Sequence, residues 1–567
     1  MNNSSNNETQ QPIGFAKKIW KFIVPMENDE EKKLGYYLSI MFTLCIFVYT
    51  SSRLLKDNLI VTKLGGDVIP IMKNFVGIFS IFFAGLYIFA TTKFNRRQLF
   101  NNTLLFLIGL FTAFGLILYP FKEKFFLSDL TVNSIMSWLQ GNTGSFFCIS
   151  KFIKMGIASL GIGTFLSIND FKVSSIMKNI IKVMVIFSFL YGVLFSFASP
   201  SLANKLSLIV QILKMWPYGM YYILSEMWGA YALSLLFWNF SNYQVKSNET
   251  IRIYPFLVLV GQFGQITAAE VVQRFSHSKN LVFAVTIATL ISGIIIFITH
   301  EYLFKTTGRE VESTTVKLKK KPSFNESLKA IMSSKSIMLT STIIVLYGIT
   351  CNLIETYWKT RLRDLSKLLF PNDAHHASAY FSYNQAAMTK YVGFLSIVTA
   401  LLSGYLLKKM GWRFSALITP LAMLIGGFFF FGLDLVHDII HIGEGNHVHL
   451  IRAAMYFGMI ILIFVKATKY TLFDNTKEIF LVSLPNEIKS QSKVADSLAG
   501  RFGKFLGAGI LLFPTFIALP LSAISVRTVI FFLMIALSLF WTFNVFKMNT
   551  IKEENDKELS PEKNANN

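Results

Sequence analysis

The feature of this chain that most limits its possible folds is a series of twelve apolar segments spread over its 567 residues. A bilayer core needs about 20 mostly apolar residues for each spanning helix, and every one of these segments is long enough. The chain is 53% hydrophobic and only 15% charged, whereas soluble domains carry about 25% charged residues. We therefore predict an all-α polytopic membrane protein with about twelve transmembrane helices. The predicted spans are residues 36–55, 69–92, 98–120, 208–240, 251–273, 280–303, 336–358, 383–408, 412–434, 450–480, 495–518 and 523–546.

A polar, lysine-rich stretch between the sixth and seventh spans divides the series into two sets of six. Many transporters consist of two similar six-helix halves, and two short motifs recur here in the same order in both sets. Val76-Gly77 recurs as Val392-Gly393, and Gly261–Gln265 recurs as Gly500–Lys504. This order favours an internal duplication over chance similarity. The predicted domains are a polar cytosolic tail at 1–33, a first six-helix half at 34–304, a basic cytosolic linker at 305–335, a second six-helix half at 336–547 and a polar cytosolic tail at 548–567.

Residues 121–207, between the third and fourth spans, depart from this symmetry. The corresponding connection in the second half, 435–449, is far shorter. The insert contains two further apolar runs, 150–168 and 180–199. If both cross the bilayer, the number of spans becomes fourteen, and if they form an outer cap or lie in the interface, it stays twelve. We favour twelve.

Lysine and arginine residues gather in the tails and loops on one side of the predicted membrane, which is the cytosolic side by the positive-inside rule. Both termini are therefore expected in the cytosol. One loop on the opposite side breaks the rule, because Lys359, Arg361, Arg363 and Lys367 follow the seventh span. Positive charge that orientation does not require suggests a functional role.

Ionisable residues also lie within or close to the apolar spans, where a charge costs about 2.5–3.5 kcal/mol on insertion scales. The set is mostly cationic, so a cavity lined by it would bind a polyanion, whereas a balanced set would indicate structural salt bridges. For any single lysine, snorkelling to the interface is the alternative. The residues are Arg53, Lys56, Asp57, Glu226, Glu355, Lys359, Lys390, Lys466, Lys469, Asp474, Lys477, Glu478, Arg501 and Lys504.

The sequence does not support several other classes of protein. The chain has no G-x-x-x-x-G-K-[ST] and no H-E-x-x-H motif, so nothing indicates ATP hydrolysis or metalloprotease chemistry. Its three cysteines are far apart and fit neither a disulfide framework nor a zinc site. The histidines of 437–449 lack a tight ligand spacing, which favours a solvated loop over a metal site. We expect a carrier and not an enzyme, with no cofactor, no nucleic acid partner and no obligate protein partner.

Longer motifs follow one another along most of the chain. They are Arg53–Asp57, Ser225–Gly229 with Leu235–Trp238, Arg252–Pro255, Lys321-Pro322 with Glu326–Leu328, Tyr347–Ile349, Asn352–Glu355 with Trp358-Lys359, Lys469–Glu478 and Gly500–Lys504. In this order they resemble the ATP/ADP translocase family of plastids, obligate intracellular bacteria and microsporidia. The resemblance implies a twelve-helix transporter similar to the major facilitator architecture, exchanging ATP for ADP without hydrolysis. Asn475 stands where the family usually has Pro, and the insert at 121–207 matches no family pattern that we identify.

The resemblance also implies roles for charged residues. Lys56, Lys477, Glu226 and Glu355 match the positions on which transport in the family relies, and the two lysines are expected to meet phosphate oxygens. The other expected substrate contacts are Arg53, Lys359, Lys469 and Arg501. The residues expected to pair with cations in the empty site, or to couple a proton, are Glu226, Glu355, Asp57 and Asp474.

Several alternatives stay open at this point. The substrates are either restricted to ATP and ADP or include GTP and GDP, and the chain is an exchanger, a proton-coupled nucleotide symporter or a carrier of a smaller phosphate-bearing anion. A non-transporting membrane receptor is a further alternative. No transit peptide is visible, and the Asn-rich N-terminal tail resembles microsporidian members more than bacterial ones. We expect a multi-pass protein in the plasma membrane of an intracellular parasite, with a mitosome-type organelle membrane as the alternative.

Overall fold

Helices make up all the regular secondary structure in the described part of this protein. The computed structural model describes residues 26–66, 68–141, 202–246, 249–307, 334–439, 444–482, 499–500, 502–503, 506–511 and 523–558. Within these residues, eight helices are long and apolar enough to cross a membrane. One of the eight, Ala374–Leu433, contains two of the predicted spans. The prediction of an all-α polytopic membrane fold is therefore confirmed.

The described part of the first half contains six long helices or helix series. They are α2 (Asp29–Leu64), α3 (Val68–Lys93), α4 (Arg96–Ala113) with η1 (Phe114–Leu118), α10 (Trp216–Trp228) with η2 (Gly229–Phe237) and α11 (Trp238–Gln244), α12 (Thr250–Phe275) and α13 (Leu281–Thr307). The shorter helices α5 (Lys122–Phe125), α6 (Asp129–Gly141) and α9 (Leu202–Lys214) connect α4 to α10. The apolar runs 150–168 and 180–199 lie outside the described residues, so their path relative to the membrane stays a prediction.

The described part of the second half contains the other long helices. They are α15 (Lys335–Leu369), α16 (Ala374–Ile439), α17 (Glu444–Thr468) with η3 (Lys469–Phe473) and α18 (Asp474–Val482), and α20 (Ala523–Glu558). The backbone of α16 is broken at Gly411, whose φ of 78° lies in the left-handed region that favours glycine. The two parts of α16 correspond to the eighth and ninth predicted spans. The eleventh predicted span lies largely outside the described residues.

Two predicted boundaries need correction. Hydropathy predicts the fourth span as one segment, 208–240, but the chain breaks between α9 and α10, where Pro217 occupies the first turn of α10. Proline is tolerated there because the first turn needs no backbone N–H, and it cannot continue a preceding helix. The seventh helix runs on to Leu369, so Arg361 lies on α15 and not in an outer loop. Arg361 is only 6% exposed, so it is buried in the folded protein.

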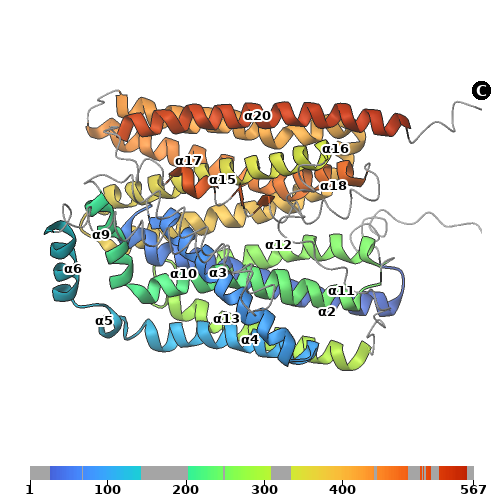
Figure 1. Ribbon diagram of the computed structural model, residues 1–567, viewed down its shortest axis with the longest axis horizontal. Helices are drawn as coiled ribbons and strands as arrows, with labels where there is room; N and C mark the ends of the chain where they lie inside the picture. Colours follow the sequence, from blue (N-terminus) through green and yellow to red (C-terminus); the bar gives the residue numbers. More distant parts are fainter. Residues whose placement is uncertain are drawn as a thin grey trace, which may run out of the picture.

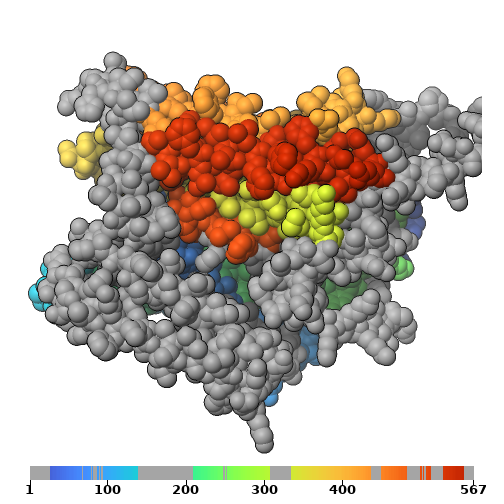
Figure 2. Space-filling view, turned by 45° about the horizontal axis from the view of Figure 1, so that its top comes forward, coloured from blue at the N-terminus to red at the C-terminus, as the bar shows by residue number. Residues whose placement is uncertain are grey.

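The two halves lie side by side as two helical bundles (Figure 1). In the most apolar 18-residue stretch of α2, 67% of the residues are buried, and in that of α15, 78% are buried. The corresponding fraction for α20 is 33%. Figure 2 shows α20 covering an outer face of the second half. The two helices that carry half of the predicted site residues are thus the most enclosed of the eight, and both lie where the halves meet.

Matched glycines in the two halves pack in the same way. A Cβ atom added to Gly264 of α12 would lie 2.2 Å from the carbonyl oxygen of Thr43 on α2. A Cβ atom added to Gly503 would lie 2.7 Å from the carbonyl oxygen of Val345 on α15. The fifth helix therefore touches the first, and the eleventh touches the seventh, at equivalent glycines. This equivalence supports the internal duplication suggested by the recurring motifs.

Candidate functional site

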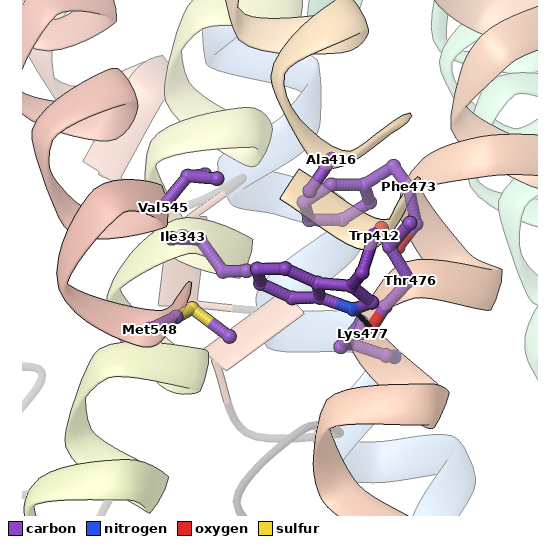
Figure 3. A pocket seen from close by; sticks show the side chains of 8 residues that line it. All are labelled: Ile343, Trp412, Ala416, Phe473, Thr476, Lys477, Val545 and Met548. Atoms are coloured by element: carbon purple, nitrogen blue, oxygen red, sulfur yellow. Dashed lines mark hydrogen bonds between the residues drawn. The ribbon is translucent and has the colours of Figure 1, made fainter. Parts of the chain in front are cut away.

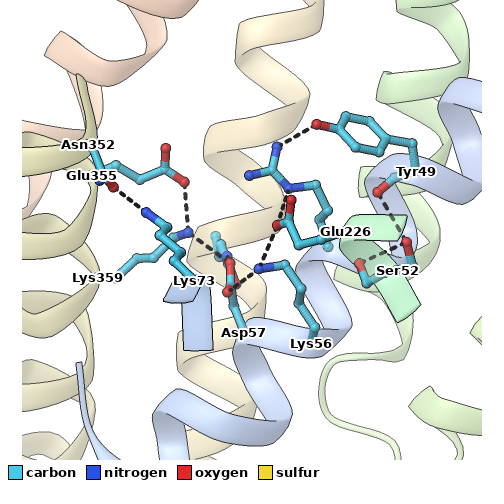
Figure 4. Close-up of polar contacts among 12 residues, drawn as sticks. Tyr49, Ser52, Lys56, Asp57, Lys73, Glu226, Asn352, Glu355 and Lys359 are labelled. Carbon is cyan, nitrogen blue, oxygen red and sulfur yellow. Dashed lines mark hydrogen bonds and ion pairs between the residues drawn. The ribbon is translucent and has the colours of Figure 1, made fainter. Parts of the chain in front are cut away.

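Charged residues cover the facing sides of α2 and α15 at the boundary between the halves (Figure 4). On α2, Arg53 precedes Lys56 and Asp57 by three and four residues, a spacing that places side chains on one side of a helix. On α15, Glu355 and Lys359 are four residues apart and share a side in the same way. The helical period alone therefore aligns each set, and the packing of α2 against α15 brings the two sets together.

The first-half side of this network centres on Lys56. Its Nζ lies 3.0 Å from Glu226 Oε1 of α10 and 3.2 Å from Asp57 Oδ1. The side chain is only 2% exposed and its Nζ lies 3.4 Å from the centre of the Tyr222 ring, which is a cation–π contact. Arg53 Nε lies 3.5 Å from the same Glu226 oxygen. One carboxylate thus holds two cations of α2.

The second-half side centres on Lys359 and Glu355. Lys359 Nζ donates to Asp57 Oδ2 at 2.8 Å and to Glu355 Oε1 at 2.7 Å. Glu355 Oε2 lies 3.0 Å from Lys466 Nζ of α17. Asp57 therefore joins Lys56 to Lys359, and the ion pairs form one continuous chain from the first half to the second (Figure 4).

Sequence reasoning missed three members of this network. Lys73 of α3 donates a hydrogen bond to Asn352 Oδ1 of α15. Gln385 Nε2 of α16 donates to Asp57 Oδ2 at 2.8 Å. Lys466 stands out in the sequence as a charge in the tenth span but not as a site residue. For Lys73 a signal existed, since a lysine only a few residues inside a predicted span is unusual, whereas nothing in the sequence distinguishes Gln385.

A further contact joins the halves next to the ion pairs. Asn58 Nδ2 of α2 donates to the backbone oxygen of Ser378 at 3.0 Å and to its Oγ at 2.9 Å. The same group contacts Ser382 Oγ one turn later on α16. These bonds, with those of Asp57, tie α2 to both α15 and α16.

The other predicted site residues of the tenth helix lie away from this network. Lys469 pairs with Asp474 at 3.1 Å and lies 5.9 Å from the ring of Tyr347 on α15. Lys477 lines a small cavity of about 10 Å³ together with Trp412 and Ile343 (Figure 3). The other residues that line this cavity are Ala416, Phe473, Thr476, Val545 and Met548.

The positions of these lysines relative to the network can be compared along α15. Ile343, beside Lys477, precedes Glu355 by twelve residues, which is about 18 Å along a helix axis. Lys466, Lys469 and Lys477 therefore follow α15 from the network towards its N-terminal end. Arg501 and Lys504 lie outside the described residues.

Two π-helical segments border the charged residues. Glu226 lies three residues before η2, and Lys469 begins η3. Such segments are rare in helices and occur frequently at functional sites, because the extra residue in the turn re-aims the side chains that follow it. The tenth helix thus departs from regular helical spacing at the residues that the sequence motif singled out.

The central network carries more positive than negative groups. Its five cations exceed its three carboxylates by two charges. The cations are Arg53, Lys56, Lys73, Lys359 and Lys466, and the carboxylates are Asp57, Glu226 and Glu355. A buried site with surplus positive charge can bind an anion with several charges. Among the described residues, no cluster of three or more His, Cys, Asp or Glu could hold a metal ion.

Solved transporter structures show a distant likeness to this chain. A crystal structure of a mutant of the nucleoside transporter NupG is 15% identical, with a TM-score of 0.39, and the alignment covers 91% of this chain and 99% of that one. A crystal structure of a D-xylose–proton symporter is 11% identical, with a TM-score of 0.44, and the alignment covers 91% of this chain and 97% of that one.

Sequence relatives extend over nearly the whole chain. The ADP,ATP carrier protein 3 of Rickettsia bellii is 27% identical, with 95% of this chain and 98% of the relative covered. The ADP,ATP carrier protein 1 of Rickettsia typhi is 26% identical, with 90% and 92% covered.

The model of one protein family, described as TLC ATP/ADP transporter, matches residues 9–154 and 177–551. Most of the insert at 121–207 therefore has a counterpart in this family, contrary to our expectation from the sequence. With the matches on both sides of the insert, the model accounts for most of the chain. This multi-pass membrane protein belongs to the TLC ATP/ADP transporter family.

Proposed function

We propose that this chain exchanges ATP for ADP across a membrane without hydrolysing either nucleotide. Support comes from its family and from the partly buried, net-cationic ion network between its two halves, which suits a polyphosphate. The network is the single observation that carries the proposal, because it places surplus positive charge where an alternating-access carrier must bind its substrate.

The proposed binding step is an exchange of partners. In the empty carrier, Glu226 holds Arg53 and Lys56, and Glu355 holds Lys359 and Lys466. Phosphate oxygens then compete with these carboxylates for the same cations. Removing a partner from a buried charge is costly, but replacing one anion by another keeps these four cations paired. The site can therefore bind and release a nucleotide without passing through an unpaired state.

The same exchange accounts for coupled transport. In the empty carrier, Asp57 accepts hydrogen bonds from Lys359 and Gln385 of the second half, which hold the two halves together. A polyphosphate that draws Lys359 away from Asp57 loosens this tie and permits the halves to rock. An empty carrier keeps the tie and does not reorient, so each inward passage requires an outward one.

Membrane potential enters through the charge of the substrates. ATP and ADP differ by about one charge, and moving one charge through 100 mV is worth about 2.3 kcal/mol. Exchange of ATP for ADP should therefore respond to potential unless a co-ion compensates. A proton carried by Glu226 or Glu355 would be such a co-ion, which is how a symporter would differ. The plasma membrane of an intracellular parasite is the proposed location, with an organelle membrane as the alternative.

Uptake by intact bacteria expressing the chain tests the proposal. Cells are loaded with radiolabelled ATP and then chased with unlabelled ATP, ADP, GTP, inorganic phosphate or buffer. We expect ATP and ADP to release the label and buffer to release none, and GTP reports the base preference. Release by phosphate as effective as release by ADP would instead indicate a carrier of smaller anions. Uptake without any chase would indicate symport.

A substitution links the activity to the network. Lys56→Ala should abolish uptake while the protein still reaches the membrane, which is checked by blotting membranes. Lys93→Ala, at an exposed lysine at the end of α3, is the matched control and should leave uptake unchanged. Normal uptake by Lys56→Ala would show that the network is not the substrate site.

A further inference from the structure

Lys73 of α3 differs from the other cations of the central network in the kind of partner it has. Each of the four others lies within ion-pair distance of a carboxylate. Lys73 Nζ instead donates to the neutral amide oxygen of Asn352. Within the part of the chain that the structure describes, no carboxylate lies within ion-pair distance of Lys73. Its positive charge is therefore hydrogen-bonded but not neutralised by direct contact.

The position of Lys73 places this charge at the boundary between the halves. Lys73 belongs to the first half, and Asn352 lies on α15 of the second half, one turn before Glu355. Figure 4 shows the Lys73 side chain pointing toward Asn352, beside Glu355 and Lys359. Lys73 thus adds to the surplus positive charge of the network, and among the described residues no directly paired carboxylate offsets this charge.

A cation in this state is suited to an incoming anion. Keeping a charge inside a membrane protein is costly, and such residues commonly mark substrate pathways. An ammonium group has three donors, and the bond to Asn352 uses one of them. A neutral amide is also displaced by phosphate at lower cost than a carboxylate, because no ion pair is broken.

We infer that Lys73 is a phosphate-binding residue of the central site and that it favours nucleotides with longer phosphate chains. This inference rests on the proposed nucleotide exchange. Asn352 acts as the partner of Lys73 in the empty carrier and gives it up when phosphate binds. Lys73 then contributes most to a triphosphate, less to a diphosphate and least to a monophosphate.

Nucleotide binding to the purified full chain in lipid nanodiscs measures this contribution. Lys73→Gln keeps a hydrogen-bond donor but removes the charge, and its affinity for ATP should fall between about tenfold and a hundredfold. The loss should be smaller for ADP and smallest for AMP. Lys73→Arg should keep most of the affinity, since a guanidinium also binds phosphate. Lys93→Gln on the same helix is the control and should bind like the wild type.

A second variant separates phosphate binding from a structural tie between α3 and α15. Asn352→Asp gives Lys73 a carboxylate partner, so the tie becomes stronger while Lys73 becomes less available to phosphate. We expect weaker ATP binding by Asn352→Asp and no fall in its melting temperature. An equal loss of affinity for ATP and AMP in Lys73→Gln, or unchanged ATP binding in either variant, would overturn the inference.

The experiment also separates this inference from the proposed function. If the wild-type chain binds no nucleotide, the proposed function itself fails. If the wild type binds ATP and Lys73→Gln binds it within about twofold of the wild type, only the role of Lys73 fails, because a lost phosphate contact should cost about tenfold or more.

Discussion

Asp57 and Lys359 occupy equivalent places in the two halves and bond to each other across the boundary, with Lys359 Nζ 2.8 Å from Asp57 Oδ2. Thr43 and Val345, the residues on which the matched glycines pack, precede them by fourteen residues each. An acid in one copy of the repeat and a base in the other therefore meet where the copies face one another. At this pair, equivalent positions of the two copies are directly bonded, beside other bonds that also join the halves.

Neutralising one member of this pair should destabilise the protein, because removal of one partner of a buried ion pair costs about 3–5 kcal/mol when no other partner remains. Here the loss should be smaller, since Lys359 keeps Glu355. The double variant Asp57→Asn/Lys359→Met should lose less stability than the two single variants together. It removes both charges at once, so neither charge is left without its partner. Thermal unfolding of the wild type, the two single variants and the double variant in detergent measures this coupling. Strictly additive losses would show that the two residues act independently.

The single variant Asp57→Asn, which leaves Lys359 in place to bind phosphate, should also leak. Without the bond between Asp57 and Lys359, an empty carrier is held together less firmly and can reorient unloaded. We expect labelled ATP to leave preloaded cells into plain buffer faster than in wild-type cells, while exchange against external ADP gains little. Efflux into buffer at the wild-type rate would show that this bond does not restrain the empty carrier.

Most of the helices could be predicted from the sequence, because burial in lipid demands about 20 apolar residues in a row. The limits of the fourth and seventh helices could not. The break before Pro217 and the continuation of α15 past Arg361 depend on how the neighbouring helices pack. Hydropathy does not record this packing, since a charged residue that is paired inside a bundle has the same hydropathy as one in a loop.

The site could be predicted to a similar extent. Arg53, Lys56 and Glu355 stand out because charges are rare in apolar segments, and the structure brings them into one network. Their partners were less accessible to prediction. Lys73 contacts Asn352, which is 279 residues away in the sequence, and Gln385 contacts Asp57, which is 328 residues away. Such pairings depend on which helices become neighbours, which the order of apolar segments does not specify.

Replacement of Glu226 by glutamine distinguishes exchange from proton symport. Glu226 contacts both Arg53 and Lys56, so Glu226→Gln should lower the rate of exchange by weakening their placement. In a proton-independent exchanger, the dependence of uptake on external pH should match that of the wild type. If wild-type uptake rises at acidic external pH and this rise disappears in Glu226→Gln, the carrier is a proton symporter and Glu226 carries the proton.

The close approach of α12 to α2 requires the absence of a side chain at Gly264. A Cβ atom there would lie 2.2 Å from the backbone oxygen of Thr43, and backbone cannot rotate away as a side chain can. Gly264→Ala should therefore separate the helices and destabilise the protein by about 1–3 kcal/mol, which is typical of overpacking. Gly404→Ala is the control, since nothing lies within 4 Å of its added Cβ atom. Equal melting temperatures for the two variants would contradict this account of the packing.

Lys477 should act at a different stage of transport from Lys56. Lys477 lines a cavity of about 10 Å³ beside Trp412, which is far too small for a nucleotide and about 18 Å along α15 from the level of Glu355. If substrate reaches Lys477 only after the halves rock, Lys477→Ala should lower the maximal rate of exchange strongly while the affinity for ATP changes little. Lys56→Ala should instead reduce the affinity itself, because Lys56 lies in the network that this conformation presents. Binding in nanodiscs and exchange in cells, measured for both variants, give the two quantities separately. Equal losses of affinity in the two variants would place Lys477 in the same binding step as Lys56.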